Sequence, residues 1–282
     1  MQKIVYTNSR GESITISQTQ PYILSFLDGT GGSGTDVQMQ KSPGQDGSGF
    51  LDVLLDSRPL NVEVTIIGED IFSYREKMSR VFNPKLGEGL LQYYYGSDLK
   101  EIKCAVDLAP VFPSGKENRG VNFQKAMFAL IAPNPYWTSP SITEEPTFQP
   151  LFQFPFEGEF EMGIQRDQRI IMNNGDADAP LQIEFYGPAV NPIILNNTTG
   201  EFIKVNRTLG EDEFMRIDTD DANVKVEFVA SDGTVTNVLN WIDLESEFFK
   251  LGVGENDIEY SADSDIQGAI VNISYRKLYV GI

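Results

Sequence analysis

The sequence has 282 residues and a mass of 31.5 kDa, with 22 basic and 41 acidic side chains and a formal net charge of −19. It contains no histidine and one cysteine, Cys104, which excludes an intrachain disulfide, multi-cysteine zinc or redox motifs, and nucleophile–histidine pairs. No apolar run approaches the roughly 18 residues of a membrane span, and the first residues are typical of a strand and not of a signal peptide.

The charge divides unevenly along a chain whose length corresponds to about two domains of roughly 150 residues each. Residues 1–140 hold 13 basic and 15 acidic side chains, a net of −2, whereas residues 141–282 hold 9 and 26, a net of −17. This balance disfavours binding to nucleic acid or to an anionic membrane surface. We therefore expect two domains in different surroundings, with an acidic surface that only maintains solubility as the alternative.

The first half is predicted to consist of short strands and one helix. Alternating apolar residues bounded by turn residues predict strands at 3–7, 13–17, 21–27, 51–55, 60–67, 89–95, 101–108 and 121–132. The helix is predicted over 70–82, because apolar residues recur at helical spacing there and Asn83 and Pro84 would end it. Its apolar stripe, which would pack on a sheet, is Ile71, Tyr74, Met78, Val81 and Phe82. Cys104 is interpreted as a small buried hydrophobe.

Residues 28–49 are rich in glycine and almost bare of large apolar side chains. So long a stretch inside a compact domain is usually functional or disordered. It lacks the Gly-Lys-Ser/Thr ending of a phosphate loop, and no helix follows it, so nucleotide binding is not expected. Val37 and Met39 are in phase across Gln38, and with Gln40 they could form a strand if a partner supplied the hydrogen bonds. We interpret these four residues as a candidate assembly arm; a disordered loop without a role is the alternative.

Prolines concentrate between residues 133 and 155, and prolines so close together preclude regular ladders. This tract predicts an N-terminal domain over 1–137, a proline-rich linker over 138–155 and a C-terminal domain over 156–282. In the second half, strands are predicted at 169–172, 182–186, 202–205, 225–229, 247–251 and 269–275. The fold class is therefore mainly β, with one α-helix in the N-terminal β domain and an antiparallel β-sandwich in the C-terminal domain.

Two acidic groups in the second half are candidates for chemistry. Asp218, Asp220 and Asp221 offer the oxygen ligands that calcium prefers, but their spacing is not that of an EF-hand, and a solvated turn is the simpler interpretation. Glu245 and Glu247 lie in an aromatic-flanked stretch. On a strand they would share a face about 7 Å apart, near the separation of a glycosidase pair. Carboxylate pairs are abundant in so acidic a domain, so no catalytic site is assigned.

Aromatic side chains in the second half could stack on sugar rings, as they do in many β-sandwich binding modules. The candidates are Trp241, Tyr260, Tyr275 and Tyr279. Core packing is the favoured interpretation, because Tyr275 is in phase with Val271 and Ile273.

Short segments throughout the chain form an ordered set. In the first half they are 45–47 (QDG), 58–62 (RPLNV), 82–84 (FNP), 87–93 (GEGLLQY) and 132–137 (APNPYW). In the second half they are 173–176 (NNGD), 186–188 (YGP), 191–196 (NPIILN), 198–201 (TTGE), 215–219 (MRIDT), 248–252 (FFKLG), 254–258 (GENDI) and 275–279 (YRKLY). Together, in this order, they resemble the distal tail proteins of bacteriophages with long, non-contractile tails.

The resemblance implies a structural role. It implies an N-terminal domain that assembles into a ring, six-fold in the family, at the end of the tail tube, around a channel for tape-measure protein and genome. It implies a galectin-like or jelly-roll C-terminal domain that faces outward and supports receptor-binding or other baseplate proteins. The implied location is the virion tail tip, with the host cytoplasm during assembly. No cofactor, metal or reaction belongs to this role.

Two other classes of function stay open at the level of sequence. One is a carbohydrate-binding module that uses the second domain to recognise sugars of the host cell wall. The other is a glycan-cleaving enzyme that uses Glu245 and Glu247. A tail-tip hub that is not an enzyme, assembles with itself and with other tail proteins, and binds neither nucleic acid nor membrane is the interpretation we favour.

Overall fold

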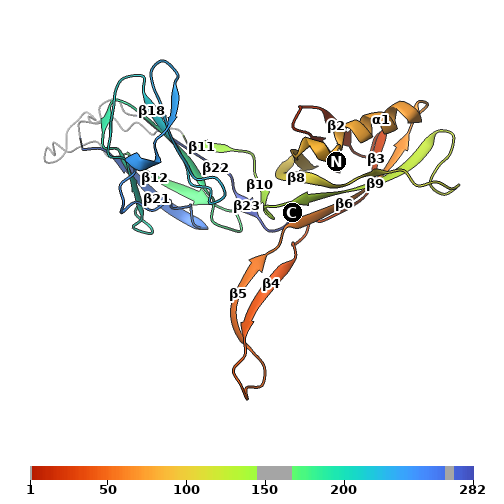
Figure 1. Cartoon of the computed structure of the whole chain (residues 1–282), viewed down its shortest axis with the longest axis horizontal. Coiled ribbons are helices and arrows are strands. Elements are labelled where there is room, and N and C mark those ends of the chain that lie inside the picture. Colours follow the sequence, from red (N-terminus) through yellow and green to blue (C-terminus); the bar gives the residue numbers. More distant parts are fainter. Residues whose placement is uncertain (1, 145–166, 264–269) are drawn as a thin grey trace, which may run out of the picture. The chain divides into compact units, whose positions relative to one another are not determined.

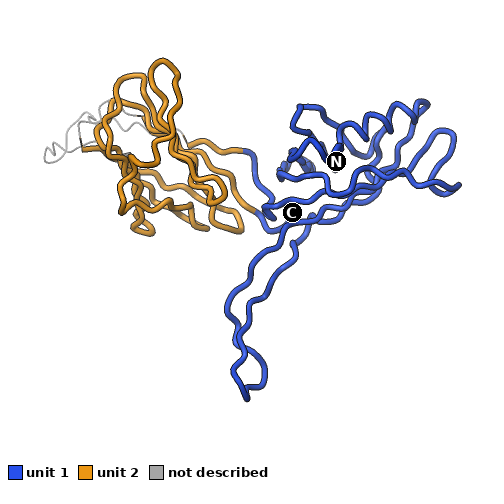
Figure 2. The backbone as a smooth tube through the Cα atoms, viewed as in Figure 1, with its two compact units in different colours: residues 1–140, 279–282 blue, residues 141–278 orange. Residues whose placement is uncertain are grey.

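The computed structural model describes residues 2–144, 167–263 and 270–282 (Figure 1). The chain divides into two compact units, the first formed by residues 1–140 and 279–282 and the second by residues 141–278 (Figure 2). The last four residues thus belong to the first unit, which the sequence pattern does not predict. Most of the linker predicted over 138–155 lies outside the described residues, so the predicted domain bounds stay a prediction.

A nine-stranded sheet forms the body of the first unit, and its main path is antiparallel throughout. The strands of that path are, in spatial order, β2 (Ser13–Ile16), β1 (Gln2–Thr7), β7 (Glu88–Tyr95), β8 (Asp98–Val111), β9 (Phe123–Ala132), β6 (Arg58–Ile67) and β3 (Tyr22–Asp28). Two short strands, β10 (Trp137–Thr138) and β23 (Leu278–Tyr279), pair with each other, and β10 also pairs with β8. Side chains alternate between the two faces, so β6 buries Leu60, Val62, Val64 and Ile66 on one face.

The predicted helix is confirmed as α1 (Ile71–Val81), which covers that apolar face of the sheet (Figure 1). The Asp70 carboxylate accepts a hydrogen bond from the Ser73 N–H at 3.0 Å and caps the first turn. Beyond the helix, Phe82 is buried and stacks on Tyr6 with ring centroids 4.7 Å apart. Among the described residues no helix has the length and apolar character needed to cross a membrane, since α1 has only 11 residues.

The 3-10 helix η1 (Pro84–Leu86) follows α1 directly, and its first turn is capped by the Asn83 side chain, which accepts from the Lys85 N–H at 3.0 Å. The stop predicted at Asn83 and Pro84 is therefore where the α-helix ends.

The second unit is a sandwich of two antiparallel sheets, which confirms the predicted fold class. The six-stranded sheet has the order β11 (Ile142–Glu144), β22 (Ile270–Tyr275), β13 (Leu181–Tyr186), β18 (Phe214–Asp218), β19 (Lys225–Val229) and β20 (Val235–Asn237). The four-stranded sheet has the order β12 (Asp167–Asn173), β21 (Gly254–Ser261), β15 (Ile193–Asn196) and β16 (Phe202–Lys204). Ile183 and Phe185 of one sheet and Ile171 and Ile258 of the other belong to one buried cluster between them.

The second unit also contains smaller elements: the ribbon β14 (Ala189–Val190) with β17 (Thr208–Leu209), and the 3-10 helix η2 (Leu239–Trp241). The strand predicted at 247–251 is wrong, because this segment is a loop in which only Leu251 makes an isolated bridge, with Ala179. Phe249 and Leu251 are buried. The alternating apolar residues that predicted a strand are therefore two side chains that attach a loop to the core. Residue 269 of the predicted last strand lies outside the described residues.

Residues 28–49 are predicted to hold an assembly arm whose strand pairs with a partner, and the structure gives that strand a partner within the chain. β4 (Thr35–Gln40) forms within these residues and pairs antiparallel with β5 (Gly49–Leu55) as a separate two-stranded sheet. The hairpin connects β3 to β6 along the chain, and Figure 1 shows it extending away from the sheet of the first unit. The hydrogen-bonding partner of β4 is therefore a strand of the same chain.

Candidate assembly surfaces

The hairpin formed by residues 35–55, called the arm from here on, exposes an apolar face. Val37 lies opposite Val53 and Met39 opposite Phe50, and because side chains alternate along a strand these four share one face. All four are exposed, from 39% for Val53 to 66% for Phe50. A two-stranded ribbon is only marginally stable in water by itself. Uncovered apolar side chains on such a ribbon are typical of an interaction surface.

The opposite face of the arm is mainly polar. Gln38 lies opposite Asp52, and its Nε2 donates to Asp36 Oδ2 at 2.8 Å. The register shifts between Gln38 and Met39, and Leu51 is the extra residue of this bulge. Of the four residues predicted as an assembly arm, Val37 and Met39 thus belong to the apolar face, and Gln38 and Gln40 to the polar face. Their role in assembly stays a prediction.

The root of the arm is built around Arg58, the first residue of β6, whose side chain is completely buried. Its Nε donates to the Pro135 carbonyl at 2.6 Å and its Nη2 to the Val280 carbonyl at 2.5 Å. Its Nη1 donates to the Gly29 carbonyl at 2.7 Å and also to the carbonyl of Gly31. Burial lowers the pKa of Arg58 from its ordinary value. One guanidinium thus joins the two chain segments that lead into and out of the arm.

The face of the first sheet opposite α1 also carries exposed apolar side chains. Met127 of β9 lies opposite Val111 of β8 on one side and Glu63 of β6 on the other, and Glu63 lies opposite Phe26 of β3. These four residues form a row across four strands, and Phe26, Met127 and Val111 are exposed. The exposed Leu108 adjoins them on β8. Apart from the exposed Glu63, this row is the second surface of the first unit with exposed apolar side chains.

Cys104 is buried in β8, as interpreted from sequence. Burial, with a smaller contribution from the Glu88 carboxylate, raises the pKa of its thiol to about 12. The thiol is therefore protonated and shielded at neutral pH.

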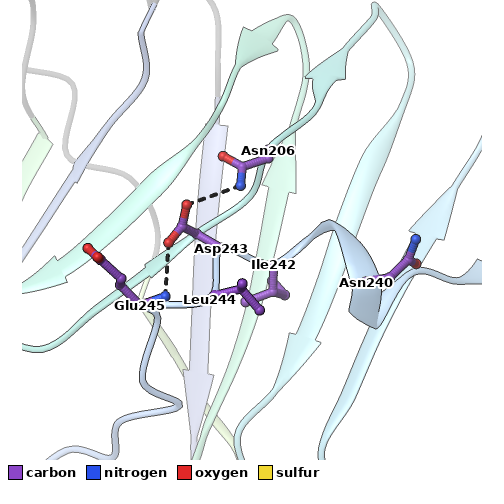
Figure 3. Close-up of a pocket in the computed structure, with 6 residues that line it drawn as sticks. All are labelled: Asn206, Asn240, Ile242, Asp243, Leu244 and Glu245. Atoms are coloured by element: carbon purple, nitrogen blue, oxygen red, sulfur yellow. Dashed lines mark hydrogen bonds between the residues drawn. The ribbon is translucent and has the colours of Figure 1, made fainter.

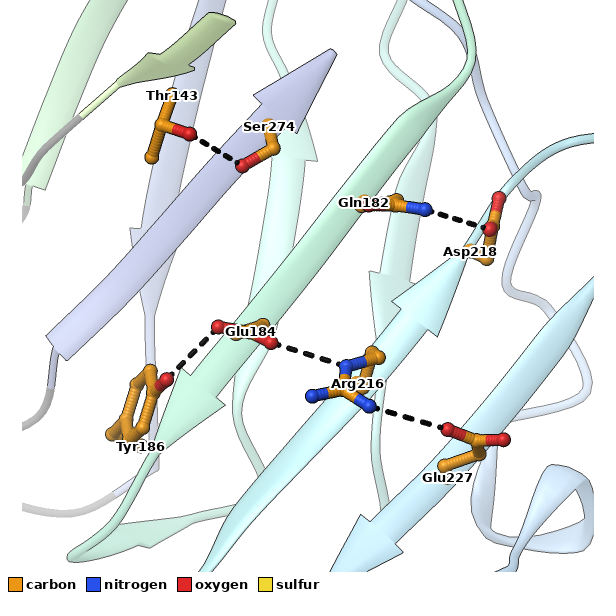
Figure 4. A network of polar contacts seen from close by, with 8 residues as sticks. All are labelled: Thr143, Gln182, Glu184, Tyr186, Arg216, Asp218, Glu227 and Ser274. Carbon is orange, nitrogen blue, oxygen red and sulfur yellow. Dashed lines mark hydrogen bonds and ion pairs between the residues drawn. The ribbon is translucent and has the colours of Figure 1, made fainter. Parts of the chain in front are cut away.

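The six-stranded sheet of the second unit presents a polar surface (Figure 4). Arg216 of β18 lies between Glu184 of β13, at 3.1 Å from its Oε1, and Glu227 of β19, at 3.6 Å from its Oε2. The Tyr186 hydroxyl donates to Glu184 Oε2 at 2.9 Å. The pKa of Tyr186 is raised, mainly by burial and to a smaller extent by this hydrogen bond. Further cross-strand bonds join Gln182 to Asp218 and Thr143 to Ser274. Most of these polar groups have a partner on the neighbouring strand.

The two glutamates considered as a glycosidase pair do not share a strand. Glu245 follows η2 in a turn and Glu247 lies in the loop after it, and both are exposed. Glu245 lines an open pocket of about 640 Å³ with Asn206, Asn240 and residues 242–244 (Figure 3). The Asp243 carboxylate accepts a hydrogen bond from the Glu245 N–H at 2.9 Å and one from the Asn206 amide at 3.1 Å. These bonds lower the pKa of Asp243, the first more than the second. This arrangement builds a turn and brings no second carboxylate of the predicted pair into the pocket.

The acidic turn at 218–221 has its carboxylates engaged within the protein. Asp218 Oδ1 accepts from the Asp220 N–H at 3.0 Å, and Asp220 Oδ1 from the Ala222 N–H at 3.1 Å. Lys250 forms an ion pair with Asp221. Within the described ranges, no three His, Cys, Asp or Glu side chains are grouped so as to hold a metal ion.

The four aromatic candidates for sugar stacking do not form one surface. Tyr260 and Tyr275 are buried in the core of the sandwich, as favoured from sequence. Trp241 packs against Phe228 with ring centroids 5.2 Å apart, and the Arg207 guanidinium covers its ring at 4.5 Å. Tyr279 belongs to the first unit, where Lys100 Nζ lies 4.3 Å from its ring centroid.

Sequence reasoning missed the role of Arg58 and of residues 279–282. In the sequence, Arg58 stands out only as the first residue of the segment 58–62 that carries the resemblance. Arginine is rarely buried, so its position at the start of an apolar strand gives no sign that its side chain is buried. The hydrogen-bond partners of Arg58 are backbone carbonyls. Because every residue type has such a carbonyl, the sequence does not reveal which residues supply them.

Comparisons with known proteins agree over almost the whole chain. Residues 9–126 match the family model of the phage tail protein RIFT-related domain, and residues 174–279 match that of the siphovirus-type tail component, C-terminal domain. A search of curated protein sequences finds no match.

Solved structures show the same fold. The chain is similar to the crystal structure of the Dit (gp 19.1) protein of phage SPP1, with a TM-score of 0.68 and 13% identity, covering 99% of each chain. It is also similar to a chain in the baseplate of phage P2 in its activated conformation with calcium, with a TM-score of 0.55 and 12% identity, covering 97% of this chain and 98% of that one. The strontium form of that baseplate gives a TM-score of 0.54 at 12% identity and the same coverage. The two family models cover both units, and the fold extends beyond them over nearly the full length. The chain belongs to the distal tail protein (Dit) family of siphophages, structural proteins of the phage tail tip.

Proposed function

We propose that six copies of this chain form a closed ring at the end of the phage tail. The ring joins the tail tube to the baseplate and receptor-binding apparatus, and its channel lets tape-measure protein and genome pass. The similarity to the SPP1 Dit protein, whose structure is described as a paradigm of the hub adsorption apparatus, supports this role. So does the similarity to a chain of the phage P2 baseplate.

The observation that carries the proposal is the uncovered apolar face of the arm. Val37, Met39, Phe50 and Val53 are exposed on a ribbon that has only two strands. A second copy offers the row of Phe26, Glu63, Met127 and Val111, in which every side chain except Glu63 is apolar. Because arm and row are different surfaces of one chain, the contact is heterologous, and such contacts give a ring when the rotation closes.

The charge distribution supports the same arrangement. Residues 1–140 are nearly neutral, at −2 against −17 for residues 141–282, so copies that meet through the first unit repel each other little. The second unit would then face outward, where its acidic surface is available to basic patches of the receptor-binding protein. The tail tube protein and the tape-measure or tail-associated protein would contact the ring. The complex would form in the host cytoplasm, become part of the virion tail tip, and bind neither nucleic acid nor membrane.

The mass of the assembled particle tests the proposal. Light scattering of the full chain at micromolar concentration, alone and with its tail tube protein, should reveal a particle of six times 31.5 kDa. Negative-stain images of the same sample should show rings with a central channel. A strict monomer under both conditions would contradict the ring.

The same preparation tests the other classes of function. Binding of the full chain to cell-wall glycans without ring formation would favour a carbohydrate-binding module. Glycan turnover that Glu245→Gln abolishes would favour an enzyme.

A further inference from the structure

The root of the arm is assembled from chain segments that are far apart in sequence. Besides the bonds of Arg58 to the carbonyls of Gly29, Gly31, Pro135 and Val280, the Ile282 N–H donates to the Thr30 carbonyl at 2.9 Å. A Cβ atom placed on Gly281 would lie 3.4 Å from the Gly31 carbonyl carbon, so the two backbones are in contact. The last four residues thus pack directly on the strand-to-arm connection at 29–31.

Arg58 binds the root through main-chain oxygens only. Nε, Nη1 and Nη2 all donate to carbonyls, and no described carboxylate lies within ion-pair distance of the guanidinium. A buried cation requires every donor to be satisfied, because an unmade hydrogen bond to a charged group is more costly than one to a neutral group. The three segments that supply the carbonyls are therefore held in one fixed arrangement around the guanidinium.

This arrangement acts on both strands of the arm. β5 ends at Leu55, three residues before Arg58, and β4 is preceded by residues 29–34, which include four glycines. Such a glycine-rich connection has many accessible backbone conformations. At its far end the Asp56 N–H donates to the Gly34 carbonyl at 2.9 Å, which joins the two strands to each other but not to the sheet. Gly29 also packs on β6, since a Cβ atom placed on it would clash with the Pro59 carbonyl oxygen. Beyond Gly29, attachment to the sheet depends on Arg58 and on the residues that cover 30 and 31.

We propose that Arg58 and residues 279–282 form a clasp that fixes the direction of the arm relative to the first sheet. Arg58 is a positioning residue: it acts through the backbone of the root and not by touching a second copy. Residues 141–278 lie between the two parts of the first unit along the chain. Because domains fold in order as the chain is synthesised, the clasp closes only after the second unit has been made. The arm of a chain that has not yet reached residue 279 is therefore left without a fixed direction, which delays assembly until residues 279–282 have been made. This last step rests on the proposed function of the arm.

A distance measurement between two spin labels tests the clasp without requiring a ring. Labels on Ser42→Cys, in the loop of the arm, and on Lys125→Cys, on β9, report the direction of the arm in the dilute subunit. Cys104 is buried, so the native protein is labelled at the two introduced cysteines. We expect a narrow distance distribution in this parent. We expect loss of the narrow distribution in Arg58→Lys and, independently, in a chain that lacks residues 279–282.

Val62→Ala is the matched control, because Val62 is also buried in β6 but takes part in none of the hydrogen bonds of the root. It should lower the melting temperature and leave the distribution narrow. The clasp is overturned if the truncated chain keeps the narrow distribution, or if Val62→Ala loses it as well. The truncated chain gives the answer even if Arg58→Lys does not fold. Ring formation by the unlabelled parent is scored separately, so failure of the clasp and failure of the ring are distinguishable.

Discussion

The arm of the first unit and the polar face of the six-stranded sheet are both exposed β surfaces, yet their side chains differ in kind. On the sheet, Arg216 lies between Glu184 and Glu227, and these polar groups are satisfied within the unit (Figure 4). On the arm, Val37, Met39, Phe50 and Val53 have no such cover. The sheet also has a buried core beneath it, whereas the arm has two strands only. A surface that is complete by itself can face water, and one that is not requires a partner.

The largest expected effect is on the free energy of unfolding, which should fall when the core beneath the polar face is changed but not when the arm is changed. Phe185→Ala should lower the free energy of unfolding of the second unit by about 3–5 kcal/mol, because Phe185 is buried between the sheets. The matched change Phe50→Ala should alter the stability of the free subunit by less than about 0.5 kcal/mol, because Phe50 is exposed there. Urea unfolding measures both, with alkylation of Cys104 as a separate reporter of the first unit. An equal loss in the two variants would mean that the arm is packed in the free subunit.

The next effect concerns assembly. Met39→Gln combined with Phe50→Gln should raise the dissociation constant between copies roughly 30- to 1,000-fold. Full burial of one apolar side chain is worth about 1.5–3 kcal/mol, and about two thirds of each of these two side chains is exposed in the free subunit. The control is Gln38→Ala combined with Gln40→Ala on the other face, which should leave the constant nearly unchanged. Sedimentation equilibrium gives both constants. Equal weakening by the two pairs would show that the faces of the arm do not differ.

A smaller effect is expected on the polar face itself. Arg216→Met should reduce stability by less than about 1 kcal/mol, because exposed ion pairs contribute little in water. The loss should shrink further at high salt, which screens the charges. Urea unfolding at low and at high salt measures it, with Gln182→Ala as a control that carries no charge change. A loss that is large and independent of salt would mean that Arg216 supports the sheet through packing.

The smallest effect concerns the turn at the pocket. Hydrogen bonds from the Glu245 N–H and the Asn206 amide lower the pKa of Asp243 in the folded state. Its stabilisation is therefore present above the unfolded pKa and is lost as pH falls through the lower folded value. Asp243→Asn should melt slightly earlier than the parent at neutral pH, and the two curves should converge on acidification. Thermal melts between pH 7 and pH 3 measure this, and a difference that is unchanged at low pH would contradict it.

Much of the fold follows from local patterns. Alternation in β6 identifies Leu60, Val62, Val64 and Ile66 as one buried face, and the helical stripe identifies the buried side of α1. These predictions succeed because side-chain direction repeats every two residues in a strand and every 3.6 in a helix, whatever the partner. The same patterns fail at 247–251, where two buried anchors of a loop imitate a strand.

Composition and local periodicity are enough to give the mainly β class, the helix at α1, the uneven charge and the lack of histidine and of a cysteine pair. The pairing of β4 with β5 and the return of residues 279–282 to the first unit follow only from the folded structure. The carbonyls around Arg58 come from positions 29, 31, 135 and 280. Every residue type carries such a carbonyl, so no local pattern distinguishes these four. Contacts of this kind are set by which backbones the folded chain brings together.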